Sequence, residues 1–343
     1  MDNVPVDSSP RSAIARRLLI QSSASGEIKL PAVPGMLDEY VTVCRMLFGS
    51  FGIQFTDDEL AHLRGVLTEQ LAQAYQASSR SQIVITYNKP ACQAVDYTIA
   101  PRCLTVEEAY ADWAATREPP LFGTEPDARL MALAAEKGEP ARCRVLDIGA
   151  GTGRNSLALA RRGHPVDAVE MTEAFAGTIA QEAAREGLDV RVLRRDIFAG
   201  AGDLQTGYGL ILLSEVVSDF RDTAQLRQVF ELAAHGLDQG GYLVFNVFLP
   251  RDGYLPDDAA RQLGQQTYTS IFTRGELAAA AAQLSLYLVA DDSVLDYEKA
   301  HLPAESWPPT SWYVRWVSGQ DVFDVPVADS PIEMRWLVYR KAG

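Results

Sequence analysis

Short apolar runs alternate with helical patterns in the second half of this chain. Apolar runs of strand length occupy residues 145–148, 165–171, 190–193, 210–213 and 242–249. Helical patterns separate most of these runs, as expected of parallel strands joined by crossover helices. The pattern predicts an α/β fold in which a doubly wound sheet carries helices on both faces.

Two further strands are predicted at residues 286–295 and 332–339, after a helix that starts within 272–277. The insertion between them, residues 296–331, is longer than an ordinary hairpin loop, and such loops tend to be functional or disordered. Its large aromatic residues are Trp307, Trp312, Tyr313 and Trp316. We expect an ordered segment that either walls a pocket or packs against the sheet edge or the N-terminal module.

The chain before the first parallel strand divides into three parts. Residues 1–30 are predicted to be a flexible tail, residues 31–104 a module of helices and a β-hairpin, and residues 105–135 a linker with lid helices. Within the module, Thr56 starts a helix and residues 82–87 and 94–99 form two strands. The apolar stripe of this helix favours a core or a homodimer surface over a ligand site.

The most informative motif is the run from Val145 to Gly153, in which an apolar strand leads directly into a Gly-x-Gly-x-Gly turn and a helix. Glycines are needed where the backbone passes close beneath a ligand, because a Cβ would fill that space. Arg154 stands where the dinucleotide fingerprint requires its third glycine, which disfavours a nicotinamide oxidoreductase. Asp147, just before the turn, suits a cationic ligand.

This motif resembles motif I of the class I S-adenosylmethionine-dependent methyltransferases. Residues 151–160 are most similar to the tellurite-resistance and thiopurine methyltransferase group, and residues 272–277 resemble a phrase before that group's final helix. The resemblance covers residues 144–295 and implies a Rossmann-like seven-stranded sheet of order 3-2-1-4-5-7-6, with the last strand antiparallel. The catalytic domain would then span residues 136–343, with the N-terminal α+β module as an extension.

The resemblance implies S-adenosyl-L-methionine as the cofactor and a set of residues that bind it. Glu170 ends the second strand at the spacing of a ribose-binding acid, although a solvated strand-end acid is the alternative. Asp196 would accept from the adenine amino group or cap a helix. The predicted cofactor set is Asp147, Gly149, Ala150, Gly151, Gly153, Asn155, Glu170, Met171, Asp196, Ile197, Ser214 and Glu215.

The catalytic and substrate residues follow from position rather than from a motif. Glu215, Asp219 and His301 are candidate bases; for Glu215 we favour contact with the methionine portion of the cofactor, and for His301 a surface or packing role. In class I enzymes the segment before the first strand often forms a lid. The predicted lid and substrate residues are Tyr110, Trp113, Phe122, Trp307, Trp312 and Tyr313.

Composition narrows the class of substrate. A net charge of −14 and a pI near 4.8 argue against a nucleic-acid surface, because phosphate backbones require clustered Lys and Arg. The cysteines and histidines are scattered, which predicts no metal site and a reducing compartment. No apolar run approaches the roughly 20 residues of a membrane span. We therefore expect a cytoplasmic methyltransferase acting on a small molecule.

Three alternatives stay open at this point. In the first, the chain methylates a protein instead of a small molecule. In the second, it binds the cofactor without turnover and its N-terminal module binds a partner. Arg11, Arg16 and Arg17 lie in an acid-free segment whose composition is shared with organelle transit peptides, for which a flexible tail is the simpler interpretation.

Overall fold

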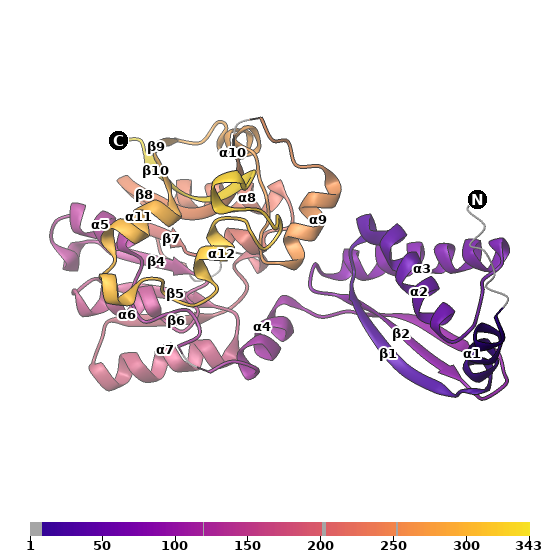
Figure 1. Cartoon of the computed structure of the whole chain (residues 1–343). Helices are drawn as coiled ribbons and strands as arrows, with labels where there is room; N and C mark the ends of the chain where they lie inside the picture. Colours follow the sequence, from indigo (N-terminus) through magenta and orange to yellow (C-terminus); the bar gives the residue numbers. More distant parts are fainter. Residues whose placement is uncertain (1–8, 119, 201–203, 252) are drawn as a thin grey trace. The chain divides into compact units, whose positions relative to one another are not determined.

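The computed structural model describes residues 9–118, 120–200, 204–251 and 253–343. The chain forms two compact units, Met1–Val106 and Glu107–Gly343 (Figure 1). The first unit contains a three-stranded sheet and the second a seven-stranded sheet. Each unit has its own hydrophobic core.

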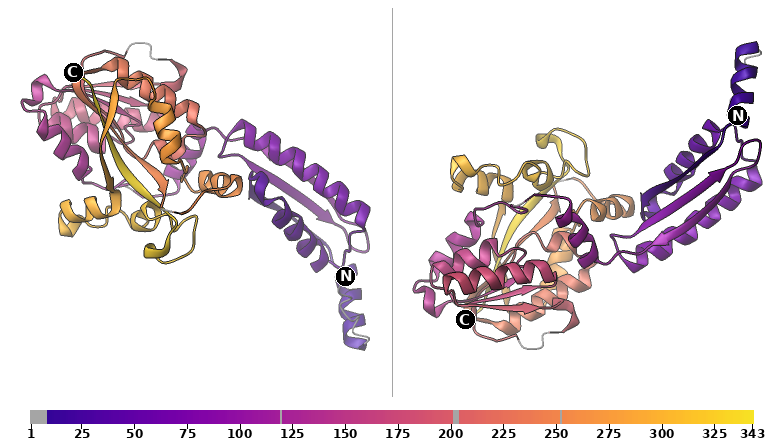
Figure 2. Two further views of the ribbon diagram at one scale, coloured as in Figure 1. Left: turned by 90° about the horizontal axis from the view of Figure 1, so that it is seen from above. Right: turned by 90° about the horizontal axis from the view of Figure 1, so that it is seen from below.

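The N-terminal unit packs helices against an antiparallel sheet of order β1-β2-β3 (Figure 2). Its elements are α1 (Pro10–Gln21), β1 (Ala24–Pro31), η1 (Pro34–Met36), α2 (Leu37–Ser50), α3 (Asp57–Ala77), β2 (Gln82–Lys89) and β3 (Asp96–Arg102). The predicted helix start at Thr56 is confirmed, because Thr56 and Glu59 form a reciprocal capping box at the start of α3. The core joins Phe48 and Leu67 of the helices to Ile85 of β2.

The prediction of a flexible tail through residue 30 is wrong for the described residues 9–30; residues 1–8 lie outside the described chain. Ser9 caps α1, and β1 pairs antiparallel with β2 along its whole length. The Lys89 ammonium donates to the carbonyls of Ile20 and Ser22 at 2.9 and 2.7 Å, which ties the end of α1 to β2. The sequence pattern missed this order because β1 mixes small and charged residues and is stabilised by a strand far along the chain.

The C-terminal unit is built on a seven-stranded sheet of order β6-β5-β4-β7-β8-β10-β9. The strands are β4 (Arg144–Ile148), β5 (Val166–Glu170), β6 (Val190–Arg194), β7 (Tyr208–Leu213), β8 (Leu237–Pro250), β9 (Leu286–Ser293) and β10 (Ile332–Lys341). β4 to β8 pair in parallel, whereas β10 is antiparallel to both β8 and β9. The predicted order and the antiparallel last strand are confirmed.

Helices cover both faces of this sheet (Figures 1 and 2). The helices of the unit are α4 (Val106–Ala115), α5 (Ala128–Glu136), α6 (Arg154–Arg161), α7 (Glu173–Glu186), α8 (Thr223–Gly236), α9 (Asp258–Gln266), α10 (Arg274–Ala281), α11 (Val294–His301) and α12 (Tyr313–Val317). Short 3-10 turns are η2 (Pro140–Arg142), η3 (Ile197–Ala199), η4 (Val217–Asp219), η5 (Ala304–Ser306) and η6 (Val327–Asp329). Thr273 and Glu276 form the capping box that starts α10, as residues 272–277 predicted.

The seven-stranded sheet has a hydrophobic core on each of its two faces, and alternate residues of its strands point into one or the other. Leu146, Ile211 and Phe245 pack with α8 and α10 on one face. Val145 and Leu212 pack with α5, α11 and α12 on the other face. Because the strands β4, β5, β6, β7 and β8 run in parallel, their carboxyl ends meet at one edge of the sheet, where a ligand is expected. Across the described residues, no helix is both long and apolar enough to cross a membrane.

Candidate active site

The glycine turn lies at the carboxyl end of β4, where φ is +72° at Gly149, +56° at Gly151 and +90° at Gly153. Residues with a Cβ rarely adopt this conformation. A Cβ on Gly149 would also lie 2.4 Å from Cγ2 of Val216. Only glycine fits at position 149, because the turn lies against the segment that follows β7. The backbone N–H groups of Gly149 and Ala150 donate to the carbonyl of Val169 at 2.8 and 3.0 Å, fixing the turn to β5.

Asp147 is buried at the end of β4, and its Oδ2 accepts a 2.6 Å hydrogen bond from Ser156 of α6. Its other oxygen, Oδ1, accepts no hydrogen bond from any described residue. Burial raises the pKa of Asp147 to about 7, only partly offset by Ser156. A cation beside Oδ1 would reverse that shift, so the geometry suits a positively charged ligand.

Glu170 is buried at the end of β5 and supports the glycine turn. Its two oxygens accept from the backbone N–H groups of Gly151 and Thr172, both at 2.8 Å. Burial raises the pKa of Glu170, and these hydrogen bonds offset part of the rise. Of the two roles predicted from the sequence, a solvated strand-end acid is wrong, because the side chain is buried. Met171 follows half-buried.

Asp196 is exposed and caps η3, since its Oδ1 accepts from the N–H of Phe198 at 2.9 Å. This contact corresponds to the alternative that the sequence left open, and the adenine contact stays a prediction. Ile197 begins the same turn and is half-buried against the core on the α8 side. Both residues therefore lie after β6, at the edge of the sheet that the glycine turn occupies.

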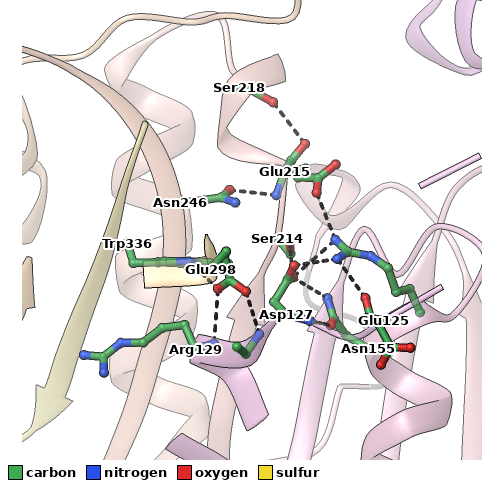
Figure 3. Close-up of polar contacts among 12 residues, drawn as sticks. Glu125, Asp127, Arg129, Asn155, Ser214, Glu215, Ser218, Asn246, Glu298 and Trp336 are labelled. Carbon is green, nitrogen blue, oxygen red and sulfur yellow. Dashed lines mark hydrogen bonds and ion pairs between the residues drawn. The ribbon is translucent and has the colours of Figure 1, made fainter. Parts of the chain in front are cut away.

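Arg154, the residue after Gly153, is the centre of a buried ion network; Figure 3 shows its carboxylate partners Asp127 and Glu215. The Arg154 guanidinium contacts Asp127 at 2.5 Å and Glu215 at 2.9 Å. Burial lowers the pKa of Arg154, but the two carboxylates outweigh it and hold the pKa above its ordinary value. Asp127 also accepts from Asn155 Nδ2 at 2.9 Å and from Ser214 Oγ at 2.6 Å.

This network includes two residues that the sequence placed in the cofactor site. The side chains of Asn155 and Ser214 hydrogen-bond to Asp127, and their contact with the cofactor stays a prediction. The sequence reasoning missed Asp127 and the role of Arg154. The signal for Arg154 was its place after the glycine turn, whereas Asp127 had only its position before a helix.

Glu215 occupies the left-handed region of the backbone, with φ at +63°. Its N–H donates to Oδ1 of Asn246 at 2.7 Å, and its carbonyl accepts from Ser218 Oγ at 3.0 Å (Figure 3). Its Oε1 binds Arg154, while Oε2 accepts no hydrogen bond from the described residues. Burial raises the pKa of Glu215 to about 7, with Arg154 offsetting part of the rise.

Glu298 of α11 is a fully buried carboxylate that the sequence did not reveal. It accepts from the N–H groups of Ala128 and Arg129 at 2.8 and 3.2 Å and from Trp336 Nε1 at 3.0 Å. Burial raises the pKa of Glu298 to about 7. The insertion thus holds the amino end of α5, the helix that Asp127 precedes (Figure 3).

The three lid candidates lie together. The Trp113 and Phe122 rings stack with centroids 5.3 Å apart, and Phe122 would be 3.4 Å from a Cβ on Gly151. Tyr110 donates its hydroxyl proton to Oδ2 of Asp219 at 2.6 Å. A line of aromatic rings therefore extends from the glycine turn to Asp219, which follows β7 in η4.

The aromatic residues of the insertion pack on the sheet. Tyr313 is buried in the core on the α5 side, and burial raises its pKa well above the ordinary value. Trp307 and Trp312 lie half-buried against Tyr313, with ring centroids 5.8 and 6.4 Å away. Of the two interpretations left open, the structure supports packing for these three residues.

His301 is exposed in the last turn of α11, where Nδ1 lies 2.7 Å from the carbonyl oxygen of Tyr297 and the ring stacks on the Tyr297 ring. The structure therefore places it at the surface, and its role as a base stays a prediction. No group of His, Cys, Asp and Glu among the described residues could hold a metal ion.

The strand order and the glycine turn define a class I Rossmann-like methyltransferase fold. Residues 145–241 match the model of a family described as a methyltransferase domain.

Two relatives align with part of the chain. "Hemagglutinin 1" of Eikenella corrodens is 35% identical over 103 residues, covering 30% of this chain and 33% of its own. "Probable S-adenosyl-L-methionine-dependent methyltransferase TehB" of Haemophilus influenzae is 30% identical over 100 residues, covering 29% of this chain and 34% of its own. The chain thus spans about a third of the length of the curated relatives it matches.

A solved structure shares the fold. The geranyl diphosphate C-methyltransferase of Streptomyces coelicolor A3(2) is 17% identical, with a TM-score of 0.51 over 69% of this chain and 97% of that one. At this identity the likeness is one of fold.

Proposed function

We propose that the chain is an S-adenosyl-L-methionine-dependent methyltransferase that acts on a small-molecule acceptor by in-line methyl transfer. The observation that carries the proposal is the combination of a bare glycine turn with two buried carboxylates, each of which has one oxygen without a partner in the described chain. The methyltransferase domain matched by residues 145–241 supports it.

The residues at the turn fit this cofactor. Oδ1 of Asp147 and Oε2 of Glu215 would hold its cationic methionine portion, because a buried carboxylate is stabilised by a positive neighbour. Glu170 would accept from the ribose hydroxyls while it still supports Gly151. Asp196 and Ile197 would meet the adenine. These carboxylates do not suit a pyrophosphate, which disfavours a dinucleotide.

When bound, the cofactor supplies a methyl group that its sulfonium already activates. The chain's own contribution is then alignment and the exclusion of water. Phe122 and Trp113 lie over the glycine turn and would exclude water from it. A covered site of this kind favours a small acceptor over a folded protein.

The test is to incubate the purified protein with tritium-methyl S-adenosyl-L-methionine and a fractionated lysate. The proposal predicts label in the low-mass fraction. Label in protein would instead support a protein methyltransferase. Cofactor binding without transfer to any fraction would support the non-catalytic alternative.

A further inference from the structure

We propose that the methyl acceptor is an amine, held through its positive charge by Asp219 and the rings of Tyr110 and Tyr268. We name these three residues the amine cluster. The inference rests on the proposed function, because it names the acceptor for that same site.

The amine cluster draws on three segments of the C-terminal unit. Tyr110 comes from α4, Asp219 from η4 and Tyr268 from the loop between α9 and α10. The Tyr110 hydroxyl is 2.6 Å from Oδ2 of Asp219, and its ring centroid lies 5.7 Å from that of Tyr268. One carboxylate and two π-systems therefore lie together, which is the chemistry that recognises alkylammonium groups.

The amine cluster is connected to the glycine turn on two sides. The Tyr110 ring lies against that of Trp113, with centroids 6.4 Å apart, Trp113 stacks on Phe122, and Phe122 lies against Gly151. Val216, three residues before Asp219, lies against Gly149. An acceptor held by Asp219 would therefore be at the same edge of the sheet as the cofactor.

A buried hydroxyl in the same loop is an independent observation. The Ser270 N–H donates to the carbonyl of Ser218 at 3.1 Å, which places Ser270 beside the residue that precedes Asp219. Ser270 is 2% exposed, and its Oγ has no hydrogen-bond partner among the described residues. A buried hydroxyl without a partner is costly, and a ligand N–H would satisfy it.

The chemical step balances with the residues present. Asp219 is placed to accept one N–H proton of the ammonium group, as a general base does. The nitrogen lone pair freed in this way forms a bond to the methyl carbon. The carbon–sulfur bond breaks with its electron pair on sulfur, so the products are a methylated ammonium and a neutral thioether.

The test is binding of three probes of similar shape to the protein saturated with S-adenosylhomocysteine. Phenethylamine is the cation, phenethyl alcohol the neutral analogue and hydrocinnamate the anion, with calorimetry as the readout. We expect the amine to bind about tenfold more tightly than the alcohol, the typical effect of one partly buried charge pair. Equal affinity for amine and alcohol, or no binding of the amine, would overturn the proposal.

Substitutions assign the preference to the amine cluster. Asp219→Asn should remove the tenfold preference while S-adenosylhomocysteine affinity stays within about twofold, which also shows that the variant is folded. Tyr110→Phe, which deletes the hydroxyl that contacts Asp219, should reduce the preference severalfold. Asp324→Asn, at a side chain 93% exposed, is the matched control and should change nothing.

An unchanged amine preference in Asp219→Asn would refute the role of this carboxylate. Failure of the wild-type protein to bind S-adenosylhomocysteine would refute the proposed function instead, so the two failures are distinguishable.

Discussion

The helices on the two faces of the seven-stranded sheet bury different chemistry. The buried residues of α8 and α10 are apolar, with Leu226, Phe230 and Leu277 among them. On the other face, α6 buries Asn155 and α11 buries Glu298. Apolar burial stabilises a fold directly, whereas buried charges stabilise it only while each is paired. The polar face therefore contributes less to stability than the apolar face, but it carries the charged groups that can bind a ligand.

The largest expected effect comes from removing the cation of the polar face. Arg154→Met leaves Asp127 and Glu215 buried without a counter-ion, which should lower the free energy of unfolding by about 4 kcal/mol. Urea denaturation measures the change. Arg154→Lys keeps the charge and should lose less than half as much; equal losses would show that the charge is not what matters.

A second prediction uses the pH dependence of Glu298. Its pKa is about 7 when folded against 4.5 ordinarily, so the folded protein keeps the proton longer. This carboxyl therefore lowers the free energy of unfolding as pH rises from about 4.5 to 7, and its effect is constant above that window. The free energy of unfolding of Glu298→Gln, relative to that of the wild type, should rise by about 3 kcal/mol between pH 4.5 and pH 7.

Unfolding curves at a series of pH values measure this difference. Glu305→Gln, at an exposed residue of the same insertion, is the control and should run parallel to the wild type. A Glu298→Gln difference that does not change with pH would contradict the burial argument.

The smallest effect is expected on the apolar face. Phe230→Leu removes ring contacts with Phe245 and Tyr339, at centroid distances of 5.9 and 4.8 Å, and should cost about 1 kcal/mol. Cofactor affinity should not change, because Phe230 is a residue of α8 and packs in the apolar core on that face of the sheet. Calorimetry measures the affinity of both proteins for S-adenosylhomocysteine. An affinity about tenfold weaker in Phe230→Leu would show that the apolar face also contributes to cofactor binding.

The sequence predicted the sheet of the C-terminal unit well because its strands are local apolar runs that end in turns. The glycine turn, Asp147 and Glu170 were found for the same reason, since each lies at the end of such a run. Residues 9–30 were predicted wrongly as a flexible tail, because β1 is stabilised by β2, which no local pattern reveals.

The buried network was beyond the sequence for a related physical reason. Asp127 lies 27 residues from Arg154, and Glu298 lies 170 residues from the backbone N–H of Ala128 that it binds. Only folding brings these partners together. Asn155 and Ser214 were placed at the correct edge of the sheet, but their hydrogen bonds go to Asp127, a partner that had not been identified.

The most direct measurement is calorimetric titration of S-adenosylhomocysteine into the wild-type protein and into Asp147→Ala and Glu170→Ala. The account predicts a wild-type dissociation constant of micromolar order, the range of a specific small-ligand site, and at least about tenfold weaker binding in both variants. No binding to the wild type, or unchanged affinity in both variants, would contradict it.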